Sequence, residues 1–201
     1  MPKQMKMKAG SKVHPSVRLY EGYEADGSGF TANVGVDKIE DIMQHFIVLH
    51  DEPIFFILEL PCRADQETPI RPGVVEKMHK DVYYIDGCSR EEALTILLRV
   101  GDILYNDGIS AFGFGGHESG DEIMFGKYNV LTVYTQAPDA YPAFFEAHEI
   151  PRVSGLVTAW DTFSAATPGK SICYEAKGQS VYDIPEQFKD WGMYLAERRE
   201  E

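Results

Sequence analysis

The residues best suited to chemistry lie in one glycine-rich stretch, residues 112–122. It holds one histidine, His117, and three carboxylates: Glu118, Asp121 and Glu122. Imidazole and carboxylate groups are common ligands of divalent cations, so His117 is a candidate metal ligand. A histidine beside carboxylates is also a candidate general acid or base, because it titrates near neutral pH. The pattern is equally typical of a hairpin loop whose polar side chains face water, and these interpretations stay open.

The spacing in this stretch matches no common catalytic motif. A metalloprotease helix needs a second histidine where Asp121 stands, and glycines disfavour a helix there. The glycines at 113, 115 and 116 lack the Lys-Ser/Thr pair of a phosphate-binding loop. Ser164 lies outside any G-x-S-x-G elbow, so it is not a predicted nucleophile. We therefore predict no cofactor and leave the catalytic residues unassigned.

A second stretch of interest is residues 160–164, which begins with Trp160 and Asp161. An aromatic side chain beside an acidic one is a common feature of contact surfaces between proteins. The alternative is a packed aromatic residue next to a turn, since aromatic side chains also dominate protein cores. Trp160 and Asp161 are therefore candidate binding residues rather than catalytic ones.

Charge is the least ordinary property of the chain. It has 19 basic and 32 acidic residues, a net charge of −13. Four of the basic residues lie among the first twelve residues, which hold no acid, so the rest has 15 basic and 32 acidic residues, or −17. A negative surface repels phosphate, which argues against nucleic acid and anionic membranes as partners. It attracts a basic protein, although the charge alone also promotes solubility.

Cysteine usage and hydropathy point to the cytoplasm. The three cysteines, Cys62, Cys88 and Cys173, are widely spaced and match neither a disulfide framework nor a zinc pattern. No apolar segment follows the N-terminal lysines, as a secretory signal would require. The longest apolar run, residues 54–58, is too short to span a bilayer.

Hydrophobic periodicity predicts one α+β domain over residues 17–201, preceded by a flexible basic arm over residues 1–16. The domain is a mainly antiparallel sheet flanked by three to four helices. Predicted helices cover residues 37–50, 89–106, 138–148 and 185–199. Predicted strands cover residues 54–58, 82–85, 111–114, 122–125, 130–134, 156–160, 172–174 and 181–184. The run 54–58, bounded by prolines, reads as a strand buried on both faces.

In composition, the chain is similar to bacterial immunity proteins, acidic proteins that neutralise basic toxins. The likeness covers no motif and assigns no residue, but it implies a protein-binding module for a basic partner. The candidate contact residues are Glu118, Asp121, Glu122, Trp160 and Asp161. Two alternatives remain: a small hydrolase or metal-dependent enzyme that uses residues 112–122, and a structural subunit of a bacterial or phage assembly.

Overall fold

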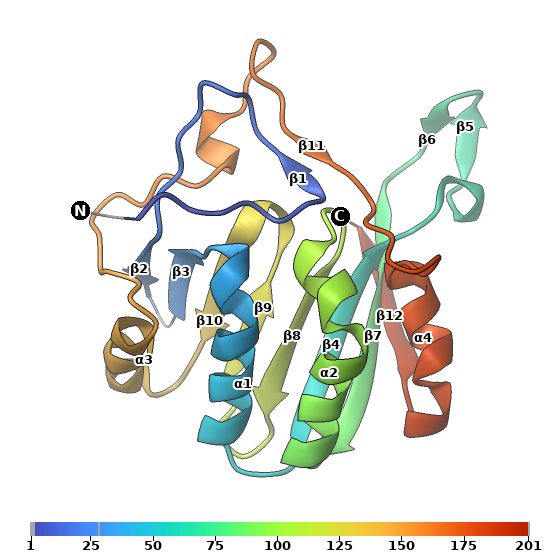
Figure 1. The fold of residues 1–201 in the computed structure, drawn as a ribbon. Coiled ribbons are helices and arrows are strands. Elements are labelled where there is room, and N and C mark those ends of the chain that lie inside the picture. The colour runs from blue at the N-terminus through green and yellow to red at the C-terminus, as the bar shows by residue number, and fades with distance from the viewer. Residues whose placement is uncertain (1–2, 28, 201) are drawn as a thin grey trace.

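The fold is α+β, built around one large antiparallel sheet (Figure 1). The structure is a computed structural model that describes residues 3–27 and 29–200. Within these residues the sheet has eight strands in the order β12-β7-β4-β8-β9-β10-β3-β2, and each neighbouring pair is antiparallel. The predicted fold class is therefore confirmed.

The strands of the large sheet are short to medium in length. They are β2 (Gly22–Asp26), β3 (Gly29–Asn33), β4 (Ile54–Pro61), β7 (His79–Cys88), β8 (Ala111–Gly116), β9 (Glu122–Phe125), β10 (Val130–Tyr134) and β12 (Tyr194–Glu200). Two small pairs lie outside it: β1 (Ser11–Lys12) with β11 (Lys170–Ser171), and β5 (Pro69–Arg71) with β6 (Val74–Val75).

Helices α1 (Ile39–Leu49) and α2 (Arg90–Asn106) lie side by side on one face of the sheet (Figure 1). The helix predicted over 89–106 begins with a capping box: the Ser89 hydroxyl accepts from the Glu92 amide, and the Glu92 carboxylate accepts from the Ser89 amide. The helix predicted from residue 37 begins at Ile39, and Asp37 does not cap it. A 3-10 turn, Val36–Lys38, precedes that helix, and Asp37 accepts instead from the Lys3 ammonium at 3.3 Å.

Two shorter helices complete the described part of the fold: α3 (Tyr141–Ala147) and α4 (Ile184–Gln187). The predicted long helix over 185–199 is wrong. Gly192 has φ of +84°, which ends the helical segment, and the residues that follow form strand β12. Arg198 secures this strand to β7 by donating to the Asp81 carboxylate at 2.6 and 2.9 Å. The predicted strands over 156–160, 172–174 and 181–184 are also absent from the described residues.

The segment predicted to be a basic arm lies against the domain over its described part, residues 3–16. Met5 is buried, and Lys8 is only 1% exposed. The Lys8 ammonium donates to the Gly126 carbonyl at 2.8 Å, and its amide donates to the Asn129 side chain at 3.0 Å. Residues 1 and 2 of the predicted arm, and residues 28 and 201 of the predicted domain, lie outside the described residues. No described helix is long and apolar enough to cross a membrane.

Candidate functional site

The two faces of the large sheet differ in how they are covered. On β4, Phe56 and Leu58 are fully buried in the main core together with the inner residues of α1 and α2. Successive side chains of a strand point to opposite faces, so Phe55 and Glu59 lie on the other side, where both are only half-buried. We call this second side of the sheet the open face. The prediction that residues 54–58 are buried on both faces is therefore wrong at Phe55.

The open face has a small apolar centre formed by Ile57, Val82 and Met124. Met124 of β9 reaches over the neighbouring strand β8 because residue 113 is glycine. A Cβ atom at Gly113 would lie 2.5 Å from the Met124 sulfur and 1.9 Å from the Ile123 carbonyl oxygen. The glycines of 112–116 thus belong to a strand, not to a phosphate-binding loop. Their lack of side chains allows side chains of neighbouring strands to lie over β8.

A row of four rings crosses the open face at one end. His117 lies 5.2 Å from Phe55, Phe55 lies 5.8 Å from Tyr84, and Tyr84 stacks on Tyr194 at 6.4 Å between ring centroids. The Phe55 ring lies over Gly115, where an added Cβ atom would approach it to 2.0 Å. Because phenylalanine and glycine alternate in β8, its two phenylalanines point into the core and its glycines leave room for the aromatic row on the open face.

The aromatic row borders an acidic end of the molecule. Asp86 accepts from the Tyr194 hydroxyl at 2.5 Å and lies 3.7 Å from Nε2 of His117. Glu118, next to His117, is exposed and has no hydrogen bond or ion pair among the described residues. Arg90 at the start of α2 donates to the Asp51 carboxylate, and its amide donates to Glu52. The carboxylates that these contacts bring to this end are Asp51, Glu52 and Asp86, with Glu118 beside His117.

A hollow of about 440 Å³ lies elsewhere on the open face. Glu59, in its wall, binds two cations: Lys80 donates to it at 2.5 Å, and Arg199 donates to it as well. Glu122 lines the same hollow and has no hydrogen bond or ion pair among the described residues. Burial and the neighbouring Glu59 raise the pKa of the Glu122 carboxyl, while Arg199 opposes them. Glu122 is therefore a half-buried carboxylate that lacks a described cationic partner.

Two exposed aromatic side chains border the hollow. Trp160 is 52% exposed, and Tyr134 is 57% exposed. Trp160 is positioned by edge-on packing against the Tyr128 ring at 4.8 Å. Its turn is held by Asp161, which accepts from the amide and hydroxyl of Thr158 at 2.8 and 2.7 Å. These hydrogen bonds lower the pKa of Asp161, so its role in the structure is to position Trp160.

Asp121 faces the interior rather than the open face. It is 6% exposed and accepts from the Tyr141 hydroxyl at 2.8 Å and from Nε2 of His50 at 3.1 Å. Burial would raise the pKa of Asp121, but hydrogen bonds from His50, Thr135 and Tyr141 lower it on balance. This carboxylate joins the β8–β9 turn to the end of α1 and the start of α3.

The structure thus separates the predicted site residues. Glu122 and Trp160 both line the hollow, and Asp161 holds the turn that carries Trp160. His117 and Glu118 lie at the acidic end. Asp121 is buried in the protein interior. Among the described residues, no group of three or more histidine, cysteine, aspartate or glutamate side chains could hold a metal ion. The carboxylate beside His117 is Asp86, not Asp121 or Glu122.

The thiols offer no activated nucleophile. Burial raises the pKa of Cys62, Cys88 and Cys173 to about 11. The thiolate, which is the reactive form, is therefore scarce at neutral pH. For Cys88, desolvation and the nearby Glu92 and Asp86 raise the pKa more than backbone hydrogen bonds lower it.

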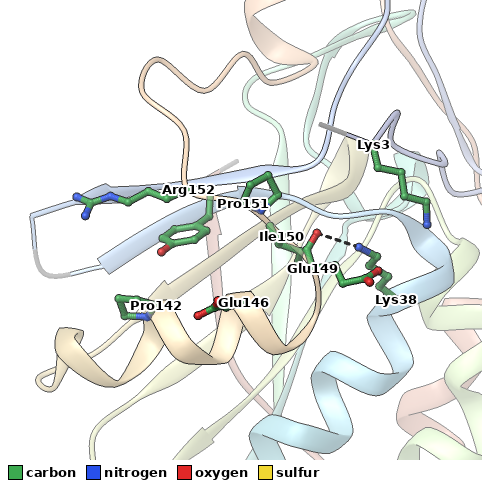
Figure 2. A pocket seen from close by; sticks show the side chains of 9 residues that line it. Lys3, Lys38, Pro142, Glu146, Glu149, Ile150, Pro151 and Arg152 are labelled. Atoms are coloured by element: carbon green, nitrogen blue, oxygen red, sulfur yellow. Dashed lines mark hydrogen bonds between the residues drawn. The ribbon is translucent and has the colours of Figure 1, made fainter. Parts of the chain in front are cut away.

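A second concavity, of about 650 Å³, lies between α3, β2 and the segment 149–152 (Figure 2). Its wall carries Lys3, Lys38, Glu146, Glu149 and Arg152 together with apolar groups. None of the predicted site residues lines it.

Comparison of the chain with protein-family models, with curated proteins and with solved structures gave no match. The fold and the surface features of the chain are therefore the only basis for describing its class. It is an α+β protein whose antiparallel sheet is covered by helices on one face and presents an aromatic and charged surface on the other.

Sequence reasoning missed the aromatic row. The sequence predicts Phe55 in a strand buried on both faces, Tyr84 in a strand and Tyr194 in a helix, because short apolar runs look alike whether one face or both are covered. The sequence signal for this row is the alternation of phenylalanine and glycine in 112–116. One face of that strand carries only glycines, which leaves space for aromatic side chains from neighbouring strands.

Proposed function

We propose that this protein is a binding module that docks a basic protein on the open face of its sheet. The observation that carries the proposal is the row of His117, Phe55, Tyr84 and Tyr194 beside the acidic end of the same surface. Partly exposed aromatic side chains flanked by charged groups are a common composition of energetically important contacts between proteins.

Charge supports a basic partner. The chain carries −13 overall, which speeds the approach of a positively charged protein. At short range, two carboxylates without a described hydrogen-bond or ion-pair partner are open to a cation: Glu118 at the acidic end and Glu122 in the hollow. An arginine or lysine side chain that enters the hollow meets Glu122 together with the Trp160 and Tyr134 rings, which favours cation–π contact. The hollow is mixed in charge, because Lys80, Lys127 and Arg199 also line it.

The test compares surface variants in partner capture. The immobilised protein is incubated with lysate of the source organism, and a retained protein is purified and titrated against each variant. Tyr84→Ala and Glu122→Lys should each weaken binding at least about tenfold, as expected for residues that dominate the binding energy of a contact. Binding should also weaken as sodium chloride rises, because salt screens the attraction.

Glu40→Lys is the matched control. It changes the net charge by the same amount as Glu122→Lys, but Glu40 is exposed on α1, on the covered side of the sheet. We expect less than about a twofold effect from it, since only long-range attraction changes. Equal losses in both charge variants, or full binding by Tyr84→Ala, would contradict docking on the open face.

A further inference from the structure

The two outer strands of the large sheet, β2 and β12, differ in how their free edges are covered (Figure 1). The edge of β2 is closed by residues 151–156. The Tyr23 amide donates to the Pro151 carbonyl, and the Tyr23 carbonyl accepts from the Val153 amide, both at 2.9 Å. The Glu24 carboxylate accepts from two further amides of the same segment. This edge therefore leaves little backbone free to pair with another strand.

The edge of β12, in contrast, is open. All seven residues of the strand are exposed. Its backbone pairs with β7 on one side, and on the other side it forms no backbone hydrogen bond among the described residues. A bulge between Leu195 and Glu197 limits the regular part of this edge to residues 197–200. A row of free amide and carbonyl groups of this kind is a template for an added strand.

The charges of this open edge are self-complementary. Residues 197–200 read Glu-Arg-Arg-Glu, so the segment is neutral in a chain of net charge −13, and residues two positions apart carry opposite charges. In an antiparallel pair, two opposite residues point their backbone groups both toward the partner strand or both away from it. That direction alternates along a strand, so two copies of β12 can set opposite each other only residues separated by an even number of positions. This excludes the register with Arg198 opposite Arg199, in which like charges would face each other.

The register centred on Arg198 brings opposite charges together. It sets Glu197 of each copy against Arg199 of the other. Both side chains lie on the open face, because Arg199 lines the hollow and Glu197 stands two positions before it. Arg199 already lies 3.2 Å from Glu197 of its own strand, so two copies form a ring of four alternating charges. Each central Arg198 is neutralised by Asp81, to which it donates at 2.6 and 2.9 Å.

The neighbouring registers are less favourable. Centring the pair on Glu197 sets two carboxylates opposite each other and runs the contact through the bulge. Centring it on Arg199 overlaps residues 198–200 of the described strand, whereas centring it on Arg198 overlaps residues 196–200. Charge and overlap together therefore favour Arg198 as the centre.

We propose that two copies of this chain associate through β12, in the antiparallel register centred on Arg198, to form one continuous sheet. Opposite residues of an antiparallel pair point to the same face, so the two open faces lie on the same side of the dimer. The contact is short, which places it among the weak, reversible interfaces. The inference goes beyond docking of a basic protein, because the dimer presents two copies of the aromatic row and binds a repetitive partner with avidity.

Equilibrium sedimentation of the intact protein tests the proposal. We expect a reversible dimer with a Kd of about 100 µM, typical of a small interface. Hydrogen exchange measured below and above this concentration locates the contact: amides within residues 197–199 should exchange more slowly in the dimer, because pairing protects them. A monomer up to about 1 mM, or a dimer without added protection in β12, would overturn the proposal.

Charge variants test the register. Glu197→Arg sets two pairs of arginines opposite each other and should raise the dimer Kd at least about tenfold. Adding Arg199→Glu to it restores opposite charges across the strands and should return Kd to within about threefold of wild type. A double variant that dimerises no better than Glu197→Arg would contradict the cross-strand pairing.

Two controls separate this contact from other effects. Glu40→Arg makes the same change in net charge on α1 and should alter the dimer Kd by less than about twofold, since only long-range repulsion changes. A tenfold loss in Glu40→Arg would show that net charge, not strand pairing, governs association. Tyr84→Ala, which is expected to lose the basic partner, should dimerise as wild type does. Failure of either proposal is therefore visible while the other stands.

Discussion

At the scale of single residues, the structure assigns Asp121 a supporting role. Its carboxylate collects hydrogen bonds from His50 and Tyr141, and Nδ1 of His50 lies 2.8 Å from the Phe46 carbonyl oxygen. Both ring nitrogens of His50 therefore face acceptors. A carboxylate at this position accepts hydrogen bonds from buried donors. Without it these donors would be unpaired, and an unpaired donor in a protein interior lowers stability.

The first prediction concerns this cluster. Asp121→Asn should lower the free energy of unfolding by about 3 kcal/mol, because it removes one charged partner of a buried group. The pKa of Asp121 is lowered, so the contribution of this carboxylate to stability is fully present above the ordinary aspartate pKa and is lost as the pH falls through the folded-state value. Urea unfolding of wild type and variant from pH 7 to pH 2 measures both effects.

The control is Glu118→Gln, three residues away on the exposed part of the same turn. It should change the free energy of unfolding by less than about 0.5 kcal/mol. A deficit in Asp121→Asn that persists undiminished at pH 2 would show that the carboxylate's charge is not the stabilising feature.

At the scale of elements, α1 and α3 meet through two histidines. Nδ1 of His45 lies 2.9 Å from Nε2 of His148, a separation that requires one proton between the two rings. Burial, the neighbouring His45 and Lys38 lower the pKa of His148, while Asp41 on α1 opposes them. The contact is therefore stable only while the rings share that proton.

The second prediction follows from this contact. Because the folded-state pKa of His148 is lowered, its contribution to stability is present above the unfolded pKa of about 6.5 and is lost as the pH falls through the folded value. Wild-type stability should therefore drop between pH 7 and pH 5 relative to His148→Gln, whose amide retains a hydrogen bond to His45. Thermal melting across this range measures the difference.

His14→Gln serves as the reference, since His14 is exposed and bonds only locally to Ser16. It should follow wild type at every pH. Parallel melting curves for wild type and His148→Gln would mean that the histidine contact between α1 and α3 does not respond to protonation.

At the scale of the whole molecule, the N-terminal segment joins the body of the protein through a buried lysine. Lys8 connects residues 3–16 to Gly126 and Asn129, more than a hundred positions away in the chain. Burial lowers the pKa of Lys8 to about 7, assisted by Lys127 and opposed by Asp107. An ammonium in such surroundings opposes folding whenever it is charged in the unfolded chain.

The third prediction is that Lys8→Met stabilises the protein at pH 7. The lowered pKa corresponds to a cost of about 4 kcal/mol at this pH, which exceeds the loss of about 2 kcal/mol from an unpaired Gly126 carbonyl. The net gain is about 2 kcal/mol. It should shrink as the pH rises toward 10, because the unfolded chain then also loses the proton.

Denaturant unfolding at pH 7, 8.5 and 10 tests this, with Lys12→Met as the companion variant, since Lys12 is exposed in the same segment. Lys12→Met should show little dependence of its effect on pH. A constant difference between Lys8→Met and wild type over this range would contradict a buried, titrating Lys8.

Much of the architecture was accessible from local patterns. Helix α2 followed from the Ser89–Glu92 capping box and its apolar spacing, and β8, β9 and β10 followed from short apolar runs between glycines. The C-terminal strand did not follow, because the spacing of Phe188, Trp191 and Leu195 also fits a helix. Pairing with β7 and the Arg198–Asp81 contact, both far apart in sequence, selected the strand.

The sequence alone determined the class of fold, the acidic character of the molecule and the presence of chemically capable residues in 112–122 and 160–164, because these depend on composition and local spacing. Only the tertiary structure decided which of those residues share a surface. Glu122 and Asp121 are adjacent in the chain, yet Glu122 begins β9 on the open face, whereas Asp121 lies in the turn before it and is buried against His50 and Tyr141. Sequence carries the types of side chain, but strand pairing and burial decide their neighbours.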